Sequence, residues 1–350
     1  MKVLYQYPHE SIYAGRTIYW GYKNAFTDMG HEFKTLTATS NLNQLLLDWQ
    51  PNIFITSLNR YYIRYLDLDI LKKAVKNGVV VFVNTPFWNP TISKLRINES
   101  PGLKNDKEML ELIHKGFGHI YFNSCETDDE RMDGFEQTTG YKHYTIPLAA
   151  DKTIIKPMYD KRFSADISYV GTYLPEKRHF FKEYVFPLKD KYKLKLYGQD
   201  WTIFQRILGW VQRGGQYFNI PYLRTINKPK LRLEDEAKIY NSSTISINVH
   251  EEYQKRYGGD CNERTFKIPL AGGFEITDDV ACIRKYFKEG EEIVIAKDKK
   301  DWFEKIDYYI KNPEKRLAII EAGHEKVLKK HTYHNRVEEV IHLYEGVKRS

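Results

Sequence analysis

Short apolar runs alternate with amphipathic stretches through the first half of the chain. Val79–Val83 is the clearest expected strand, because five apolar and mostly β-branched residues follow one another. Other strands are expected at 2–7, 32–36, 53–56, 119–123 and 144–146, and helices at 16–29, 41–49, 66–76 and 107–115. Apolar strands that alternate with helices indicate a parallel sheet covered on both faces.

The same alternation begins again after residue 160. Strands are expected at 167–170, 193–197, 244–249, 274–277 and 293–295, and helices at 177–188, 234–240 and over most of the chain from 301 onward. The boundary lies near 150–161, where Pro147 and Pro157 flank a polar turn. We therefore predict an α/β protein with two doubly wound, Rossmann-like domains, at 1–150 and 151–330. Their strand ends face a cleft, and a helix at 331–350 packs back on the first domain.

The stretch from Asp260 to Asp279 carries the first candidate chemistry. Its apolar spacing predicts a short helix, which Asp260 or Asn262 can cap and which Gly272 ends. A helix N-terminus with Arg264 beside it is suited to an anion, because unpaired N–H groups and a guanidinium point the same way. The alternative is an ordinary helix–strand connection with a surface arginine.

Length and cysteine content place the chain in a broad class. At 350 residues two domains are expected, and no apolar run is long enough to cross a bilayer. The N-terminus lacks the hydrophobic core of a secretion signal. Cys125, Cys261 and Cys282 are far apart without metal-ligand spacing, which is typical of a reducing compartment, so we expect a cytoplasmic protein.

The charge is unevenly placed. The first 150 residues balance, so the net charge of +8 lies in the second half. Trp201 to Leu233 contains no acidic residue, but it contains the cations Arg206, Arg213, Arg224, Lys228, Lys230 and Arg232 among six aromatic residues. This mixture favours a phosphate-bearing partner with stackable rings, such as DNA. The alternative is a solvated basic face whose aromatic residues lie in the core.

Several short segments resemble a known enzyme family. They are IPLAAD at 146–151, DISYVGTYLPEKR at 166–178, LYG at 196–198, ISINVH at 245–250, ERTFKIPLAGGFEITD at 263–278 and HTYHNR at 331–336. Together they are similar to the spore-maturation (CgeB-like) branch of the group 1 glycosyltransferases, which have the GT-B fold. The N-terminal half matches only in outline. The resemblance implies transfer of a sugar from a nucleotide-diphosphate sugar, a UDP-sugar, to an acceptor hydroxyl.

The resemblance places the donor in the C-terminal domain, on Gly171, Lys177, Arg178, Tyr197, Gly198, Asn248, His250 and Arg264. Gly171 would let the backbone approach the diphosphate, and Arg264 with the N–H groups of Thr265 and Phe266 would hold it as the sugar bond breaks. Lys177 and Arg178 can instead be a plain basic helix end, Tyr197 a core tyrosine, and His250 a capped loop histidine.

One position departs from the family. Five residues before Gly272 the family has a glutamate that accepts hydrogen bonds from ribose, whereas this chain has Lys267. A lysine only donates, so Glu263 replaces that glutamate, or Lys267 binds phosphate, or the donor is unusual. Pro269 also removes a backbone donor inside the helix.

No convincing Asp-x-Asp metal pair follows a strand. Asp67 and Asp69 have the spacing, but they precede a helix and are expected to cap it. We therefore expect transfer without a metal ion. The resemblance implies a retaining reaction. For an inverting one, His9 or Glu10 after the first strand would be the catalytic base, and the alternative for both is a loop-capping role.

The acceptor is expected on the N-terminal domain, at the loops 8–16 and 84–89. Arg16 and an aromatic platform of Phe87 and Trp88 are its candidate contacts, with Arg206 and Arg213 of the basic segment. A packed aromatic corner is the alternative for the platform. Hydroxymethylated DNA and a surface glycan or protein both remain as acceptors.

The sequence bears on two other possible functions. A non-catalytic DNA-binding or scaffold module on the same fold is favoured by Lys267. An oxidoreductase is disfavoured, because no G-x-G-x-x-G follows the first strand.

Overall fold

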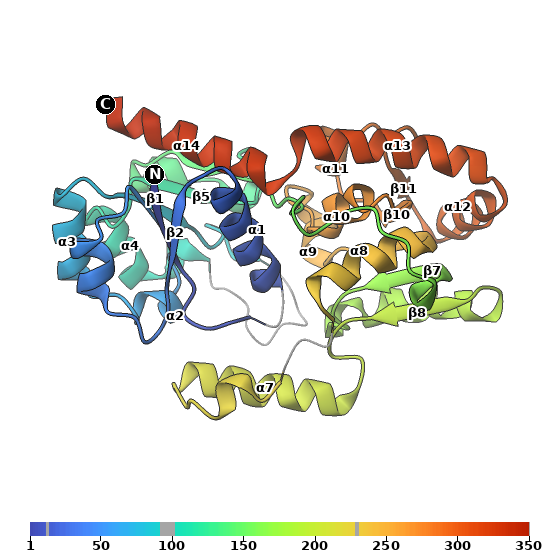
Figure 1. The fold of residues 1–350 in the computed structure, drawn as a ribbon, viewed down its shortest axis with the longest axis horizontal. Helices are drawn as coiled ribbons and strands as arrows, with labels where there is room; N and C mark the ends of the chain where they lie inside the picture. Colours follow the sequence, from blue (N-terminus) through green and yellow to red (C-terminus); the bar gives the residue numbers. More distant parts are fainter. Residues whose placement is uncertain (12–13, 92–101, 228–230, 350) are drawn as a thin grey trace.

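The computed structural model describes residues 1–11, 14–91, 102–227 and 231–349. It contains two parallel sheets in separate halves of the molecule (Figure 1). The residues at 12–13 in the first acceptor loop, Lys228 and Lys230 of the basic segment, and Ser350 lie outside the described residues.

The N-terminal sheet has the order β2-β1-β3-β4-β5-β6, and every neighbouring pair is parallel. Its strands are β1 (Lys2–Gln6), β2 (Glu32–Leu36), β3 (Ile53–Ser57), β4 (Val80–Asn84), β5 (Ile120–Asn123) and β6 (His143–Thr145). The helices around it are α1 (Ala14–Asp28), α2 (Arg60–Ile63), α3 (Leu68–Lys76), α4 (Lys107–His114) and α5 (Phe135–Thr139).

Strand β4 shows why its sequence is apolar throughout. Val81 and Val83 lie in the core on one face of the sheet, whereas Val80 and Phe82 lie in the core on the other. Alternate residues of a strand point to opposite faces, so a strand covered on both sides needs apolar residues at every position. Asp67 caps α3 by accepting from the N–H groups of Asp69 and Ile70, which confirms its capping role.

The C-terminal sheet has the order β11-β10-β9-β7-β8 and is also parallel. Its strands are β7 (Ala165–Val170), β8 (Leu194–Tyr197), β9 (Ser243–Asn248), β10 (Glu275–Asp278) and β11 (Val294–Ala296). Its main helices are α7 (Ile203–Tyr217), α8 (Leu233–Ser242), α9 (Glu252–Tyr257), α10 (Arg264–Leu270), α11 (Ile283–Tyr286), α12 (Lys299–Lys311) and α13 (Pro313–Lys330).

The helix expected at 177–188 is present but irregular. It begins as a 3₁₀ turn at Pro175–Lys177, continues through α6 (Arg178–Phe180) and a π-helical turn at Phe181–Val185, and ends as a 3₁₀ turn at Phe186–Asp190. Pro187 has no backbone N–H to donate, so a regular α-helix cannot continue through it.

The last helix, α14 (Tyr333–Arg349), returns to the N-terminal half and runs across its top (Figure 1). Its Val337 and Val340 are buried in the same core as Phe26 of α1. Gly21 of α1 allows this packing, since a Cβ there would lie 2.2 Å from the Tyr333 ring. The two halves are therefore joined twice, by the connection after β6 and by α14.

A buried ion triad also joins the halves. Arg131 donates to both carboxylate oxygens of Asp129 at 2.8 Å and to Asp260 of the C-terminal half at 2.6 Å. All three side chains are almost completely buried.

Asp260 therefore does not cap α10. Asn262 does so, because its side-chain oxygen accepts from the Arg264 N–H at 3.0 Å.

Candidate active site

A cleft of about 1350 Å³ lies between the two halves and is lined by both. Residues at the carboxyl ends of β1, β3, β4, β7 and β8 contribute to its wall. Ligands of open parallel sheets bind at this edge, because the loops that follow the strands gather there. This cleft lies where the sequence analysis expects one, between the strand ends of the two halves.

Arg264 extends into the cleft from the first residue of α10. Its Nε donates to Asn248 Oδ1 at 3.0 Å and its Nη2 donates to the Val249 carbonyl at 3.0 Å. Within the described part of the chain, its Nη1 has no hydrogen bond and the side chain has no carboxylate partner. The guanidinium is thus positioned by neutral oxygens, and the nearby carboxylates of Glu236 and Glu251 act on it only through space.

Lys177 brings a second cation to the same carbonyl. Its Nζ donates to the Val249 oxygen at 2.8 Å, and the side chain is buried. Burial, and next the charge of Arg264, lower the pKa of Lys177 to about 7. Glu251 acts on both cations electrostatically, but neither makes an ion pair within the described structure. Such a pair of cations is suited to an anion, because an anion would relieve their mutual repulsion.

Gly171 and Gly198 allow the backbone to pass close to these cations. A Cβ at Gly171 would lie 2.8 Å from Nη1 of Arg264 and 2.5 Å from the Tyr169 hydroxyl. Gly198 has a φ of +118°, and a Cβ there would lie 2.3 Å from the Gly171 oxygen. Both glycines line the cleft, as does the exposed Arg178.

Asn248 and His250 lie behind Arg264 and do not line the cleft. The Asn248 amide holds Arg264 through its oxygen and donates to Glu275 at 2.8 Å. His250 pairs with Asp278 at 2.7 Å, and burial lowers the pKa of His250. Both residues therefore support the site from behind. The direct contact with the donor that was expected for each of them is not found.

The amides at the start of α10 are not free. The N–H of Thr265 donates to the Asn262 carbonyl and the N–H of Phe266 donates to the Glu263 carbonyl. These bonds form because the chain already turns before the helix begins. The Phe266 side chain packs against Tyr286 in the core. The predicted clamp of free amides is corrected, and the cationic side chains remain.

Lys267 is paired with carboxylates. Its Nζ lies 2.9 Å from Glu236 of α8 and 3.4 Å from Glu263. Burial opposes the charge of Lys267, but these carboxylates raise its pKa overall. Glu263 also accepts from the Tyr333 hydroxyl at 2.6 Å and from Thr17 of the N-terminal half.

Glu236 was not expected from the sequence, yet it lines the cleft beside Lys267. The Glu236 carboxylate lies 2.9 Å from the Nζ of Lys267, the residue that occupies the position of the family's glutamate. No local signal marks it, because the pairing joins residues 31 positions apart.

Two expected contacts are placed elsewhere. Tyr197 is half-buried, packs edge-on against Phe163 and does not line the cleft, which favours the alternative interpretation of a packed tyrosine. Trp88 is 4% exposed and packs edge-on against Phe135, so this part of the aromatic platform is a packed corner. Of the two platform residues, Phe87 does line the cleft.

His9 and Glu10 do not line the cleft. The Nε2 of His9 accepts from Arg224 at 2.8 Å and its Nδ1 is bonded to Tyr61. Burial and the charges of Arg224 and Arg64 lower the pKa of His9 to about 4. Both ring nitrogens are engaged in hydrogen bonds, and the exposed Glu10 does not line the cleft, so the structure favours neither residue as a catalytic base.

The remaining acceptor candidates do reach the cleft. Arg16 lines it and donates to the Leu231 carbonyl at 2.9 Å. Arg206 and Arg213 line it from α7. Gln6 and Asn123, which the sequence did not single out, lie at strand ends on the same side. Strand-end polar residues were the signal that could have found them.

Comparisons with known proteins agree with this geometry. Residues 178–342 match the glycosyl transferase-like family. The fold is similar to that of sucrose-phosphate synthase from Thermosynechococcus elongatus, with a TM-score of 0.61, 10% identity and 99% of each chain covered. It is also similar to the catalytic domain of starch synthase IV from Arabidopsis thaliana, with a TM-score of 0.65, 10% identity and 99% of each chain covered.

The chain has the two-domain GT-B fold, and its residues 178–342 are similar to the glycosyl transferase-like family.

Two further similarities concern individual relatives. The fold is also similar to that of an α-glucosyltransferase in complex with UDP, with a TM-score of 0.64, 11% identity, and 99% of this chain and all of that one covered. Spore protein CgeB of Bacillus subtilis (strain 168) is 22% identical over 211 residues, which are 57% of this chain. The match spans 61% of the length of CgeB, so it supports the CgeB-like branch only weakly.

The described residues contain no group of three or more His, Cys, Asp or Glu side chains arranged to hold a metal ion. No helix in the described ranges is long and apolar enough to cross a membrane.

Proposed function

We propose that this protein is a glycosyltransferase that moves a sugar from a nucleoside-diphosphate sugar, a UDP-sugar, to an acceptor hydroxyl in the cleft. The single observation that carries the proposal is the pair of cations on the Val249 carbonyl. Lys177 and Arg264 meet there beside Gly171, without a carboxylate partner in the described structure. A diphosphate supplies the missing negative charge.

The proposed reaction breaks the bond between the anomeric carbon and the diphosphate oxygen and forms a bond from that carbon to the acceptor oxygen. The acceptor proton leaves to the departing diphosphate. Negative charge grows on the leaving phosphate in the transition state, so prearranged cations lower the barrier most at that point. Arg264 and Lys177 take this role, with no step assigned to a metal ion.

Retention fits the residues at the cleft better than inversion does. An inverting enzyme needs a base beside the acceptor, and His9 is neutral with both nitrogens bonded away from the cleft. Retention needs no strong protein base, since the leaving diphosphate accepts the proton. NMR of the first-formed anomer tests this, and an inverted product would overturn it.

The donor is proposed from the neighbours and from the site. The α-glucosyltransferase was solved with UDP and starch synthase IV with ADP. Glu236 of this chain lies in the cleft wall, where a carboxylate can accept from ribose hydroxyls while Lys267 holds it in place. A hydrolysis screen over nucleotide-sugars, with and without EDTA, tests donor and metal independence together. If EDTA abolished turnover and a divalent ion restored it, the proposed metal independence would be contradicted.

The acceptor is proposed to be a surface glycan rather than DNA. The DNA alternative has support from the α-glucosyltransferase solved with UDP and a 13-mer DNA. In this chain, however, Arg206 and Arg213 are the only cations among the described residues of the basic segment that line the cleft, and most exposed side chains of α7 are apolar. A gel shift on hydroxymethylated duplex DNA at several salt concentrations tests this choice. Tight, salt-sensitive binding would favour DNA.

The non-catalytic module loses its main argument. It rested on Lys267, and that charge is balanced by Glu236 in the cleft wall. Thermal shift with nucleotides separates the two hypotheses, because a module without a donor site would not be stabilised.

The cysteines are free and buried, which supports the proposal of a reducing, cytoplasmic location.

A further inference from the structure

Helix α7 presents its apolar side chains to solvent. The residues that face the protein are Gln205, Gly209, Gln212 and Gly215. The exposed residues of the helix include Ile203, Phe204, Ile207, Trp210 and Tyr217. This arrangement is the reverse of a surface helix in a globular protein, which buries its apolar stripe.

The inner face of α7 is polar for a structural reason. Gln212 accepts from the Asn227 N–H at 2.9 Å and so holds the returning chain. Gly215 allows Leu223 to pack closely, since a Cβ would lie 2.4 Å from it. The helix therefore packs through its small and polar side, and Ile203, Phe204 and Ile207 on its apolar side are exposed.

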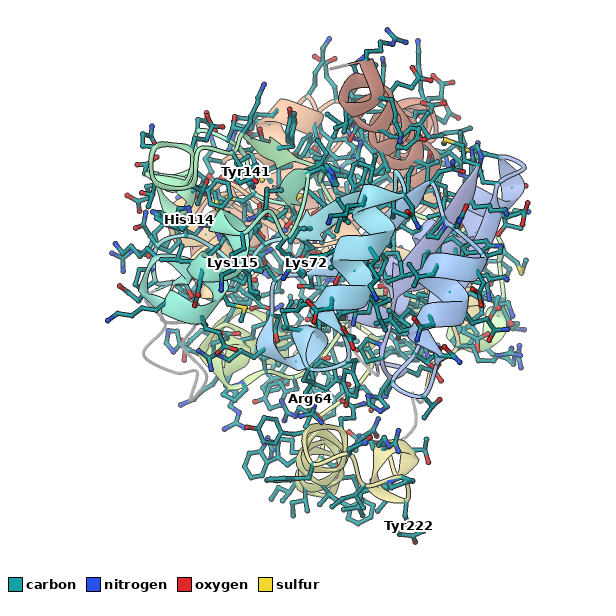
Figure 2. All side chains as sticks on the ribbon, turned by 90° about the vertical axis from the view of Figure 1, so that its left-hand side faces the viewer. Arg64, Lys72, His114, Lys115, Tyr141 and Tyr222 are labelled. Atoms are coloured by element: carbon teal, nitrogen blue, oxygen red, sulfur yellow. The ribbon has the colours of Figure 1, made fainter. Side chains whose placement is uncertain are left out.

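The apolar surface continues beyond the helix into the following turn. We define the α7 surface as Ile203, Phe204, Ile207, Trp210, Tyr217, Phe218, Ile220 and Tyr222. Phe204 is 68% exposed and Tyr222 is 80% exposed. Figure 1 shows α7 below both halves and apart from their sheets, and Figure 2 shows Tyr222 at its outer edge. The surface protrudes and forms no groove.

Contacts with the N-terminal half hold the α7 surface in place. Arg64 donates to the Gln216 carbonyl at 3.3 Å and its guanidinium lies 5.5 Å from the centre of the Tyr217 ring. Arg224, in the turn after α7, bonds to His9 at 2.8 Å. The segment belongs to the C-terminal half in sequence, but it is braced against the N-terminal half.

We propose that the α7 surface docks on a membrane surface that contains anionic lipids. Aromatic and aliphatic side chains on a protruding helix partition into the headgroup region, and basic residues without acidic neighbours are attracted to anionic headgroups. The chain has no acidic residue from 201 to 233. Docking is peripheral, since no described helix is suited to cross the bilayer.

Two other occupants fit the surface less well. DNA would need a surface made mainly of cations to meet its phosphates, whereas the α7 surface is mainly apolar and Ile203, Phe204 and Ile207 cannot donate a hydrogen bond. A second copy would bring two acid-free basic segments together, and their like charges would repel. Anionic lipid satisfies the apolar and the basic character at once.

Docking would also place the cleft at the membrane. Trp210 belongs to the α7 surface and lines the cleft together with Arg206 and Arg213 of the same helix. The cleft mouth therefore opens beside the docked helix, and the acceptor would be a hydroxyl of a lipid-anchored glycan. This last step rests on the proposed function, whereas membrane docking does not.

Vesicle sedimentation tests the docking directly. The full chain is mixed with vesicles of phosphatidylcholine alone or with about 30% phosphatidylglycerol, at low and high salt. We expect binding to the anionic vesicles that weakens as salt rises. The double variant Phe204→Ser/Ile207→Ser should bind about tenfold more weakly, because two exposed apolar side chains are lost.

The matched control is Leu317→Ser/Leu328→Ser, which removes two exposed apolar side chains of α13 and should leave binding unchanged. Tyr222→Ser serves as a second variant outside the helix, and about a threefold loss is expected for it. Far-UV circular dichroism confirms that each variant is folded.

Equal binding of the double variant and the parent would overturn the proposal. So would vesicle binding that does not depend on lipid charge, dimerisation in light scattering that the double variant abolishes, or duplex DNA binding that it abolishes. The assay contains no sugar donor, so its outcome is independent of whether the proposed transfer occurs.

Discussion

Arg264 is surrounded by neutral oxygen acceptors rather than carboxylates, which leaves its charge available to a ligand. Charge-assisted hydrogen bonds contribute more than neutral ones, and a planar guanidinium suits the paired oxygens of a diphosphate. Among single side chains, this is the one on which the proposed function depends most.

Replacement of Arg264 by alanine should weaken UDP binding by about 10–100-fold, the equivalent of one or two charge-assisted hydrogen bonds. Isothermal titration calorimetry measures the change. Arg284→Ala is the matched control, because Arg284 is paired with Asp279 and Glu289 on the surface and should leave the affinity unchanged. Unchanged affinity in the Arg264 variant would refute the donor site.

Lys177 should make nucleotide affinity depend on pH. Its pKa of about 7 in the free protein should rise when a diphosphate binds, because the anion favours the charged form. Affinity is then constant below pH 7, where Lys177 is already protonated. It falls by up to about tenfold per pH unit above pH 7, where binding must take up a proton.

Titrations of UDP binding from about pH 6 to 9 measure this dependence. The Lys177→Met variant should bind more weakly at low pH and lose the decline above pH 7. A decline that is the same in both proteins would show that another group titrates.

The turns after β7 and β8 are the elements that shape the donor site. Gly171 and Gly198 bring two strand ends so close that neither leaves room for a side chain. Helix α10 contributes Arg264 from its first residue, and its buried face holds it in the core. Strand ends and one helix start therefore set the distance between the cations.

A methyl group at Gly171 should displace Arg264, since its Cβ would meet the guanidinium. We expect Gly171→Ala to weaken UDP binding about tenfold, with a smaller effect on thermal stability. Gly214→Ala is the control, because no atom lies within 4 Å of a Cβ there, and alanine favours the helix. Calorimetric titration and thermal melting separate the two effects, and an unaltered affinity would contradict the close approach.

The two halves of the molecule are joined by contacts that no single domain contains. The triad of Arg131, Asp129 and Asp260 is buried at their junction, and α14 crosses from one half to the other. The cleft exists because these contacts hold the two strand edges opposite each other.

Arg131→Met should lower the free energy of unfolding by about 3–5 kcal/mol, because it leaves two carboxylates buried without a cation. Urea-induced unfolding measures the loss. Adding Asp129→Asn and Asp260→Asn to this variant removes the uncompensated charges and should restore part of the stability. A stability equal to that of the parent would mean that water reaches the triad.

Local pattern was enough to predict the elements and several donor residues. Strand β4, the Asp67 cap and the cleft edge followed from periodicities of two and 3.6 and from the rule that parallel strands end together. Arg264 was a candidate because it begins a helix, whereas Gly171 and Lys177 were implied by the family resemblance. These features depend on residues within a few positions of one another.

Pairings between distant residues were decided by packing. The sequence does not show that Lys267 forms an ion pair with Glu236 or that Arg224 forms a hydrogen bond with His9. Nor does it show that Trp88 is buried in the core while Phe87 lines the cleft. The orientation of α7 is a further case, because its apolar stripe predicts burial and the folded chain exposes it. Side-chain environment arises only when separate segments come together, so a linear pattern cannot specify it.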